Sequence, residues 1–129
     1  MFRPHYKKVA DWETNQWIGR GFPVQMPTEV IIAKGQNLEA GSVLGRKADG
    51  KYVLSAAQNG AGEAIKDGTE KPRLILAEPI DARAYDMRGV AFRTGSYIKQ
   101  GLTFGKGHTP ETTRDDLELR SIYFEEGTN

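Results

Sequence analysis

The side chains that could hold a metal ion are few in this chain. His5 and His108 are the only histidines among 129 residues, and there is no cysteine. A histidine-based metal site needs two or three such ligands with carboxylates nearby. Because both histidines lie in polar sequence, far apart along the chain, we interpret them as solvated surface residues. Without cysteine, disulfides, thiol nucleophiles and thiolate ligands are excluded, so the sequence predicts no metal site and no cofactor.

Carboxylates are the next candidates for chemistry. Adjacent acids occur at Asp115-Asp116 and Glu125-Glu126. Glycosidase chemistry needs two carboxyl groups that face each other across a cleft, with one of them in surroundings that raise its pKa. Neighbouring acids on a helix point apart, so we interpret the first pair as a solvated face and the second as part of a frayed tail. Glu78 and Asp81, on either side of Pro79, are better placed, but a structural turn or an ion pair between subunits explains them more simply.

The remaining motifs of enzymes and nucleic-acid-binding proteins are absent or thin. The serines lack the Gly-x-Ser-x-Gly context of a nucleophile, and the glycine spacing in 55–71 does not match a phosphate-binding loop. Phe92-Arg93 and Tyr97-Ile98-Lys99 give only a sparse pattern of aromatic and basic residues, and the net charge is only +1, which argues against broad phosphate contact. We therefore predict that the chain is not an enzyme and binds neither nucleic acid nor a small-molecule substrate.

Composition favours a small, mainly β fold. The 15 glycines and six prolines are typical of many turns between short strands. No apolar run is long enough for a membrane span, and the amino terminus lacks the apolar segment of a signal peptide. These features predict a single domain without a membrane partner, made in the cytoplasm.

The strongest local signal is a β-hairpin. Asp49-Gly50 lies between Val43–Arg46 and Tyr52–Leu54, where glycine supplies the positive φ of a tight turn. Asn37–Gly41 is interpreted as another turn and 81–88 as a polar connection. Leu74–Ala77 is continuously apolar, as expected of a strand buried on both faces or pressed against another subunit. Further strands are expected at 30–33, 90–93, 97–98 and 122–124, and 100–104 alternates in the same way. The spacing of the turns predicts a β-clip or distorted barrel.

One short helix is expected near the carboxyl terminus. Thr109 can cap free amides with its hydroxyl, Pro110 suits the first helical position, and Glu111 faces the positive end of the helix dipole. The helix should end near Leu119, although Leu117 and Leu119 do not lie on one stripe.

The first 28 residues differ from the rest. They hold both tryptophans and three prolines but show no period of 2 or 3.6. Large aromatic residues and arginine are the residues that anchor interfaces. We therefore predict an extended arm over 1–28 followed by a β-rich domain over 29–129. The alternative is that Trp12 and Trp17 cover one end of the barrel as ordinary core.

Several short segments together resemble the lambda-type bacteriophage head decoration proteins. They are Asn37–Arg46, Asp49–Tyr52, Leu74–Asp81, Val90–Arg93 and Leu102–Phe104, and the resemblance covers roughly residues 36 to 124. It implies a small β-rich protein that assembles as a homotrimer on the outer surface of the expanded icosahedral head. Its partner would be the major capsid protein of the same virus, and binding would stabilise the shell against internal DNA pressure. In that family the amino-terminal arm is mobile in the free protein and orders on the capsid.

Composition and pattern, not the resemblance, select the candidate contact residues. For capsid contact by the arm we predict Phe2, Tyr6, Trp12, Trp17 and Arg20. For packing in the trimer we predict Leu74, Ile75, Leu76 and Phe92. The alternative function is a phage tail or surface adhesion module that binds a host glycan. Such a module would require an aromatic platform beside polar side chains on the folded body.

Overall fold

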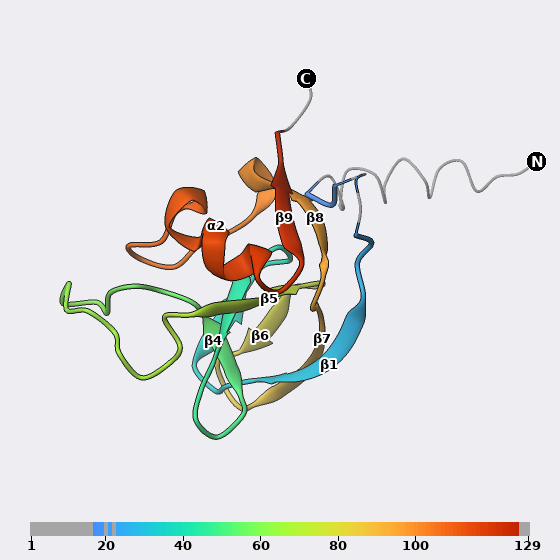
Figure 1. Ribbon diagram of the computed structural model, residues 1–129. Helices are drawn as coiled ribbons and strands as arrows, with labels where there is room; N and C mark the ends of the chain where they lie inside the picture. The colour runs from blue at the N-terminus through green and yellow to red at the C-terminus, as the bar shows by residue number, and fades with distance from the viewer. Residues whose placement is uncertain (1–16, 20, 22, 127–129) are drawn as a thin grey trace, which may run out of the picture.

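A computed structural model describes residues 17–19, 21 and 23–126 of the chain. It is mainly β, with a closed barrel and one short α-helix near the carboxyl terminus (Figure 1). This confirms the predicted fold class. The elements, in chain order, are β1 Pro27–Ile32, β2 Gln36–Leu38, β3 Val43–Arg46, β4 Tyr52–Leu54, β5 Pro72–Leu76, β6 Ile80–Ala82, β7 Met87–Phe92, β8 Gly95–Ile98, the 3-10 turn η1 Lys99–Gly101, α2 Pro110–Glu118 and β9 Ile122–Glu125.

Five strands close the barrel in the order β1-β4-β3-β5-β7. The longest pairing is the antiparallel one between β1 and β7, which runs from Pro27↔Phe92 to Ile32↔Met87. The parallel contact of β1 with β4 is a single pair, Ile32↔Tyr52. Closure leaves the barrel with no free sheet edge. The two other sheets, β2 with β6 and β8 with β9, have two strands each and lie outside the barrel.

The predicted hairpin is confirmed. β3 and β4 pair in antiparallel register, and Gly50 has φ 91°, a conformation that glycine adopts without steric cost. The Lys47 amide donates to the Lys51 carbonyl over 2.7 Å, and the Asp49 carboxylate accepts from the Lys51 amide at 3.0 Å. The turn chemistry and the register therefore agree.

Strand β5 separates two apolar clusters and contributes side chains to both. Leu74 and Leu76 face the barrel interior, whereas Ile75 faces a second cluster under β8, β9 and α2. Side chains of a strand alternate between its two faces, so β5 is buried on both, and burying each of these residues contributes about 1.5–3 kcal/mol. The prediction of a strand buried on both faces is confirmed. Both faces are covered within one chain.

Three segments differ from expectation. The segment interpreted as a turn after Gln36 contains β2, and the predicted polar connection contains β6, paired through Leu38↔Ile80. The alternating segment 100–104 is not a strand, because η1 and a single bridge from Ser42 to Thr103 replace it. Strands of three residues are too short to show a period of 2, and their pairing comes from tertiary packing.

The predicted helix is confirmed as α2. The Thr109 hydroxyl accepts from the Thr112 amide at 3.2 Å, and the Thr112 hydroxyl accepts from the Thr109 amide at 2.9 Å, which completes a reciprocal cap. Leu117 is fully buried and Leu119 is 86% exposed, so the two leucines do lie on different faces. No helix in the described residues is long and apolar enough to cross a membrane.

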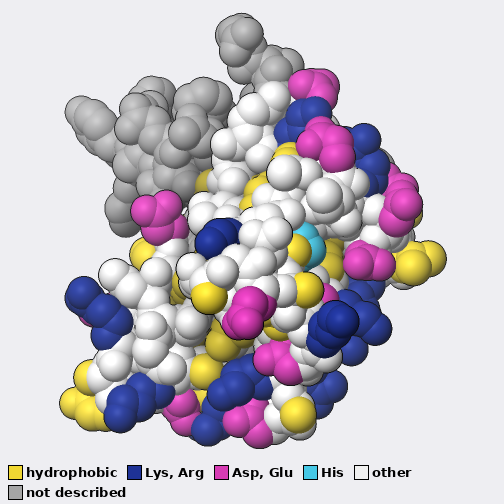
Figure 2. Space-filling model, turned by 90° about the vertical axis from the view of Figure 1, so that its left-hand side faces the viewer, with side chains coloured by type: hydrophobic (Ala, Val, Ile, Leu, Met, Phe, Trp, Pro, Cys, Tyr) yellow, Lys and Arg dark blue, Asp and Glu magenta, His cyan; other side chains and the backbone are white. Residues whose placement is uncertain are grey.

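The molecule has two distinct ends (Figure 1). The hairpin tip and the loop before β7 lie at one end, joined by a 2.7 Å ion pair between Lys51 and Asp86. Strands β8 and β9 lie at the other end, with the first described residues. In Figure 2, basic and acidic side chains alternate over the face in view, without one large patch of a single sign.

Candidate functional site: the root of the amino-terminal arm

The first described residues extend the small sheet formed by β8 and β9. β8 and β9 are parallel, and Ile18 forms an antiparallel bridge with Tyr97 on the other side of β8. The Ile98 amide donates to the Trp17 carbonyl at 2.8 Å, and the Gly19 amide donates to the Ser96 carbonyl at 2.7 Å. The chain therefore enters the body as an edge segment on β8. We call the described residues of 17–25 the arm root.

Trp17 fixes the start of the arm root. Its side chain is only 4% exposed and packs against Tyr97 and Phe92, with ring centroids 6.0 and 6.1 Å away. A Cβ on Gly101 would collide with Trp17, so glycine is required there for close approach. Burial raises the pKa of the Tyr97 phenol, whose hydroxyl donates to the Thr94 carbonyl at 2.7 Å. The placement of Trp17 agrees with the core interpretation, and the docked root leaves almost none of its indole exposed to a partner.

A carboxylate holds the next part of the arm root. Oε2 of Glu125 accepts a 2.7 Å hydrogen bond from the Gly21 amide and a short hydrogen bond from the Ser96 hydroxyl. The Ser96 carbonyl also accepts from Nε2 of Gln25 at 2.7 Å. These bonds join the arm root, β8 and β9 at one place, and we call them the Glu125 clasp.

The clasp corrects the interpretation of the acidic pair at the end of β9. Glu125 belongs to the strand and bonds the arm root, so it is not part of a frayed tail. Glu126 pairs with Lys99 at 2.7 Å, and the hydrogen bond from Lys99 lowers the pKa of the Glu126 carboxyl. The two adjacent acids therefore have different partners, one in the arm root and one at Lys99.

The other predicted arm contacts cannot be placed. Phe2, Tyr6, Trp12 and Arg20 lie outside the described residues. Their role in capsid contact stays a prediction. The predicted boundary at residue 28 also stays a prediction, although β1 begins at Pro27 and the arm root already packs on the body.

The residues predicted for trimer packing are mostly buried against other residues of the same chain. Leu74, Ile75 and Leu76 are at most 8% exposed, and half-buried Phe92 packs against Trp17. Side chains buried in one subunit offer little surface to another. The trimer itself stays a prediction, and its contacts require residues that are exposed in the single chain.

The candidates for chemistry have structural partners. His108 is half-buried, with Nε2 2.7 Å from the Glu70 carbonyl, so it is not simply a solvated surface residue. His5 lies outside the described part of the chain.

Asp81 forms a 2.8 Å ion pair with Arg83, and hydrogen bonds from Arg83 lower the pKa of Asp81 to about 2. Asp81 itself lies within β6, and Arg83 follows it by two residues in the same chain. Among the described residues no group of three or more His, Cys, Asp or Glu side chains could hold a metal ion.

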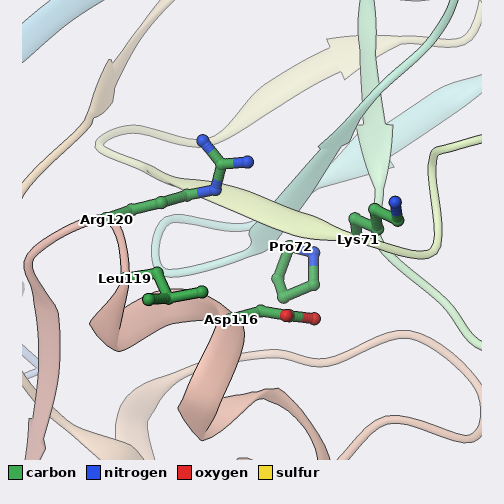
Figure 3. A pocket seen from close by; sticks show the side chains of 5 residues that line it. All are labelled: Lys71, Pro72, Asp116, Leu119 and Arg120. Atoms are coloured by element: carbon green, nitrogen blue, oxygen red, sulfur yellow. The ribbon is translucent and has the colours of Figure 1, made fainter.

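One shallow hollow lies between the start of β5 and the end of α2. It has a volume of about 240 Å³ and is lined by Lys71, Pro72, Asp116, Leu119 and Arg120. Figure 3 shows Lys71 and Arg120 on either side of Pro72, with Asp116 on the helix and Leu119 directly after it. The lining has no serine, cysteine or histidine.

Comparison with known proteins adds one match. The family model for bacteriophage lambda head decoration protein D matches residues 19–120. No curated protein matches the chain. The matched region begins within the arm root and ends after α2, so it includes the barrel.

Proposed function

This chain belongs to the bacteriophage lambda head decoration protein D family, and from that membership we propose how it decorates a capsid. Membership implies a structural role at the phage head. We propose that the protein binds the major capsid protein on the outer surface of the expanded head, does so as a homotrimer, and stabilises the shell against internal DNA pressure. Synthesis in the host cytoplasm completes the proposal.

The observation that supports this proposal is the docked arm root. The root is an edge segment on β8, at the end of the barrel opposite the hairpin tip. A chain that leaves the body from a sheet edge is suited to continue by strand addition, in which backbone hydrogen bonds give affinity and side chains give specificity. Phe2, Tyr6, Trp12 and Arg20 would then contact the capsid directly, whereas buried Trp17 would position the arm.

Trimer formation would strengthen this contact. Once one arm has bound, the others bind at a high effective concentration, so weak single contacts combine into tight capture. The protein would prefer the expanded head if only the expanded arrangement of capsid subunits exposes a sheet edge that the arm can pair with. A ligand favours one of two states by the difference between its affinities for them.

Co-sedimentation with capsids tests the proposal. The full chain and a variant lacking residues 1–16 are mixed with expanded and unexpanded capsids of the same virus. The deletion stops at residue 16 because Trp17 is buried in the body and β1 begins at Pro27. We expect saturable binding of the full chain to expanded capsids, with loss in the variant. Binding to neither form would contradict the proposal, and light scattering of the free protein tests the trimer.

A second candidate, glycan binding, has one observation in its favour. Tyr85 is 71% exposed in a loop that is held by the Arg83–Asp81 and Lys51–Asp86 pairs. An exposed ring beside polar groups is the platform that glycan adhesion requires. Binding to a glycan array that is lost in Tyr85→Ala, together with no affinity for capsids, would favour this function over decoration.

A further inference from the structure

We propose that Glu125 is a positioning residue that sets the point from which the arm leaves the body. Together with the packing of Trp17, its carboxylate holds the arm root on β8, so that the arm begins at Trp17 and not further along the chain. The inference rests on the proposed capsid-binding function, because it concerns the arm that would make the contact.

The geometry of the clasp supports this role. One oxygen of Glu125 accepts from Gly21 in the arm root and from Ser96 in β8. Hydrogen bonds to an ionised acceptor are roughly twice as strong as those between neutral groups. The carboxylate therefore adds a strong bond in the middle of the arm root, between the backbone bonds of Trp17 and Gly19 and the side-chain bond of Gln25.

Glycines in the arm root allow the carboxylate to approach. A Cβ on Gly19 would collide with the Glu125 carboxylate and lie 2.7 Å from the Ser96 carbonyl oxygen. A Cβ on Gly21 would lie 3.0 Å from the same Glu125 Oε2. Neither glycine has a φ in the left-handed region, so close packing, and not backbone conformation, explains the absence of side chains at both positions.

Without the carboxylate the root would lose its bond at Gly21, in the middle of the segment. Two backbone hydrogen bonds to β8, from Gly19 and to Trp17, would remain with the packing of Trp17. At the other end of the root, the bond from Gln25 to the Ser96 carbonyl and the bond from the Thr94 hydroxyl to the Val24 carbonyl would remain as well. If the root separated from β8, the attachment point would move from residue 17 to β1 at residue 27, which is ten residues later (27 − 17). Ten residues span up to about 35 Å when fully extended. A displacement of that size changes where each arm of an assembled particle can reach.

The barrel does not depend on the clasp. The Gly21 bond is exposed, and the side chain of Glu125 belongs to neither apolar cluster. Removal of the carboxylate should therefore loosen the root while β1–β7 stay folded. If Glu125 contributed only to global stability, its removal would destabilise the root and β1–β7 together.

The experiment compares Glu125→Ala with Glu126→Ala. Glu126 is the matched control, because it is the adjacent acid and makes its own ion pair with Lys99, outside the clasp. Hydrogen exchange reports on the amides of 17–25, and Trp17 fluorescence in a Trp12→Phe background reports on burial of the indole. Affinity for expanded capsids is measured for the same proteins, and Glu125→Gln tests rescue by a side chain that still accepts hydrogen bonds.

We expect Glu125→Ala to speed exchange in the root, to shift Trp17 emission to the red and to weaken capsid binding about tenfold, because each arm loses effective concentration. Glu126→Ala should stay within about twofold of the unmodified protein, and Glu125→Gln should recover part of the loss. Unchanged exchange in Glu125→Ala would overturn the clasp, and faster exchange with unchanged affinity would overturn the positioning role.

Failure of the proposed function gives a different result. If the unmodified protein does not bind expanded capsids, the capsid role and the positioning role fail together. The exchange and fluorescence measurements then still decide whether Glu125 holds the root.

Discussion

The indole of Trp17 lies nearly parallel to the phenol ring of Tyr97, with centroids 6.0 Å apart and an angle of 10° between the planes. Stacked aromatic pairs of this kind contribute beyond their buried area. The contact joins the start of the described chain to β8, about 80 residues later, since 97 − 17 = 80. A residue that composition assigns to an interface is thus part of the core, and two tryptophans in one segment can have separate roles.

Replacing Trp17 should therefore destabilise the fold. We expect Trp17→Ala to lower the free energy of unfolding by about 3–5 kcal/mol, the usual cost of removing a large buried aromatic side chain. Urea denaturation measures the change. Trp12→Ala is the comparison, for which the arm prediction expects weaker capsid binding with an unchanged unfolding free energy. A loss below about 1 kcal/mol for Trp17→Ala would show that the indole is not core.

Gly45 should not tolerate a side chain. It sits in β3 at an irregularity of the pairing with β5, and a Cβ there would collide with the Thr69 backbone. Because backbone atoms cannot rotate away, we expect Gly45→Ala to cost about 1–3 kcal/mol of stability. Thermal unfolding is compared with Gly60→Ala, where a Cβ would meet nothing within 4 Å. Equal melting temperatures for the two variants would contradict the predicted clash.

The ion pair between Asp81 and Arg83 should be visible in a pH titration. Hydrogen bonds from Arg83 lower the pKa of Asp81 from 3.8 to about 2. The folded pKa is below the ordinary one, so any stabilisation is present above about pH 4 and is lost as the pH falls through about 2. NMR titration of the Asp81 carboxyl carbon gives the midpoint, which should return towards 3.8 in Arg83→Ala. An Asp81 midpoint near 4 in the unmodified protein would contradict the pair.

The cap of α2 should contribute measurably. Thr109→Ala removes the hydroxyl that accepts from Thr112, and loss of such a cap costs about 0.5–2 kcal/mol. Thr109→Ser keeps the hydroxyl and should lose less than about 0.5 kcal/mol. Denaturant midpoints of both variants measure the difference. If serine and alanine destabilised equally, the methyl group and not the cap would carry the effect.

Local chemistry made part of the fold predictable. Asp49-Gly50 and Thr109-Pro110 specify a turn and a helix start through the backbone geometry of those residues alone, and both were confirmed. The apolar run at Leu74–Leu76 likewise predicted a strand buried on both faces. What it could not decide was whether the second face meets the same chain or another subunit, since both environments favour the same residues.

The candidate site depended on contacts that the sequence hides. Glu125 and Ser96 are polar residues in unremarkable surroundings, and they meet Gly21 only because β8 and β9 pair in parallel across a separation of 27 residues (122 − 95). The sequence held one clue to this contact, the glycines at 19 and 21 on either side of Arg20, close to the aromatic residues Trp17 and Phe22. Glycine at alternate positions can mark a close backbone approach.

The pairing of β1 with β7 determines when the barrel of this protein can close during synthesis. Pro27 pairs with Phe92, so the barrel cannot close before residue 92 has left the ribosome, and pairing over such a separation is slow because the loop must first close. The sheet that docks the arm root waits longer still, until Ile122–Glu125 has emerged. A chain interrupted before that point could complete the barrel yet would lack the strand that carries the clasp. Only a chain synthesised through Glu125 has the complete sheet and the carboxylate to which the arm root bonds.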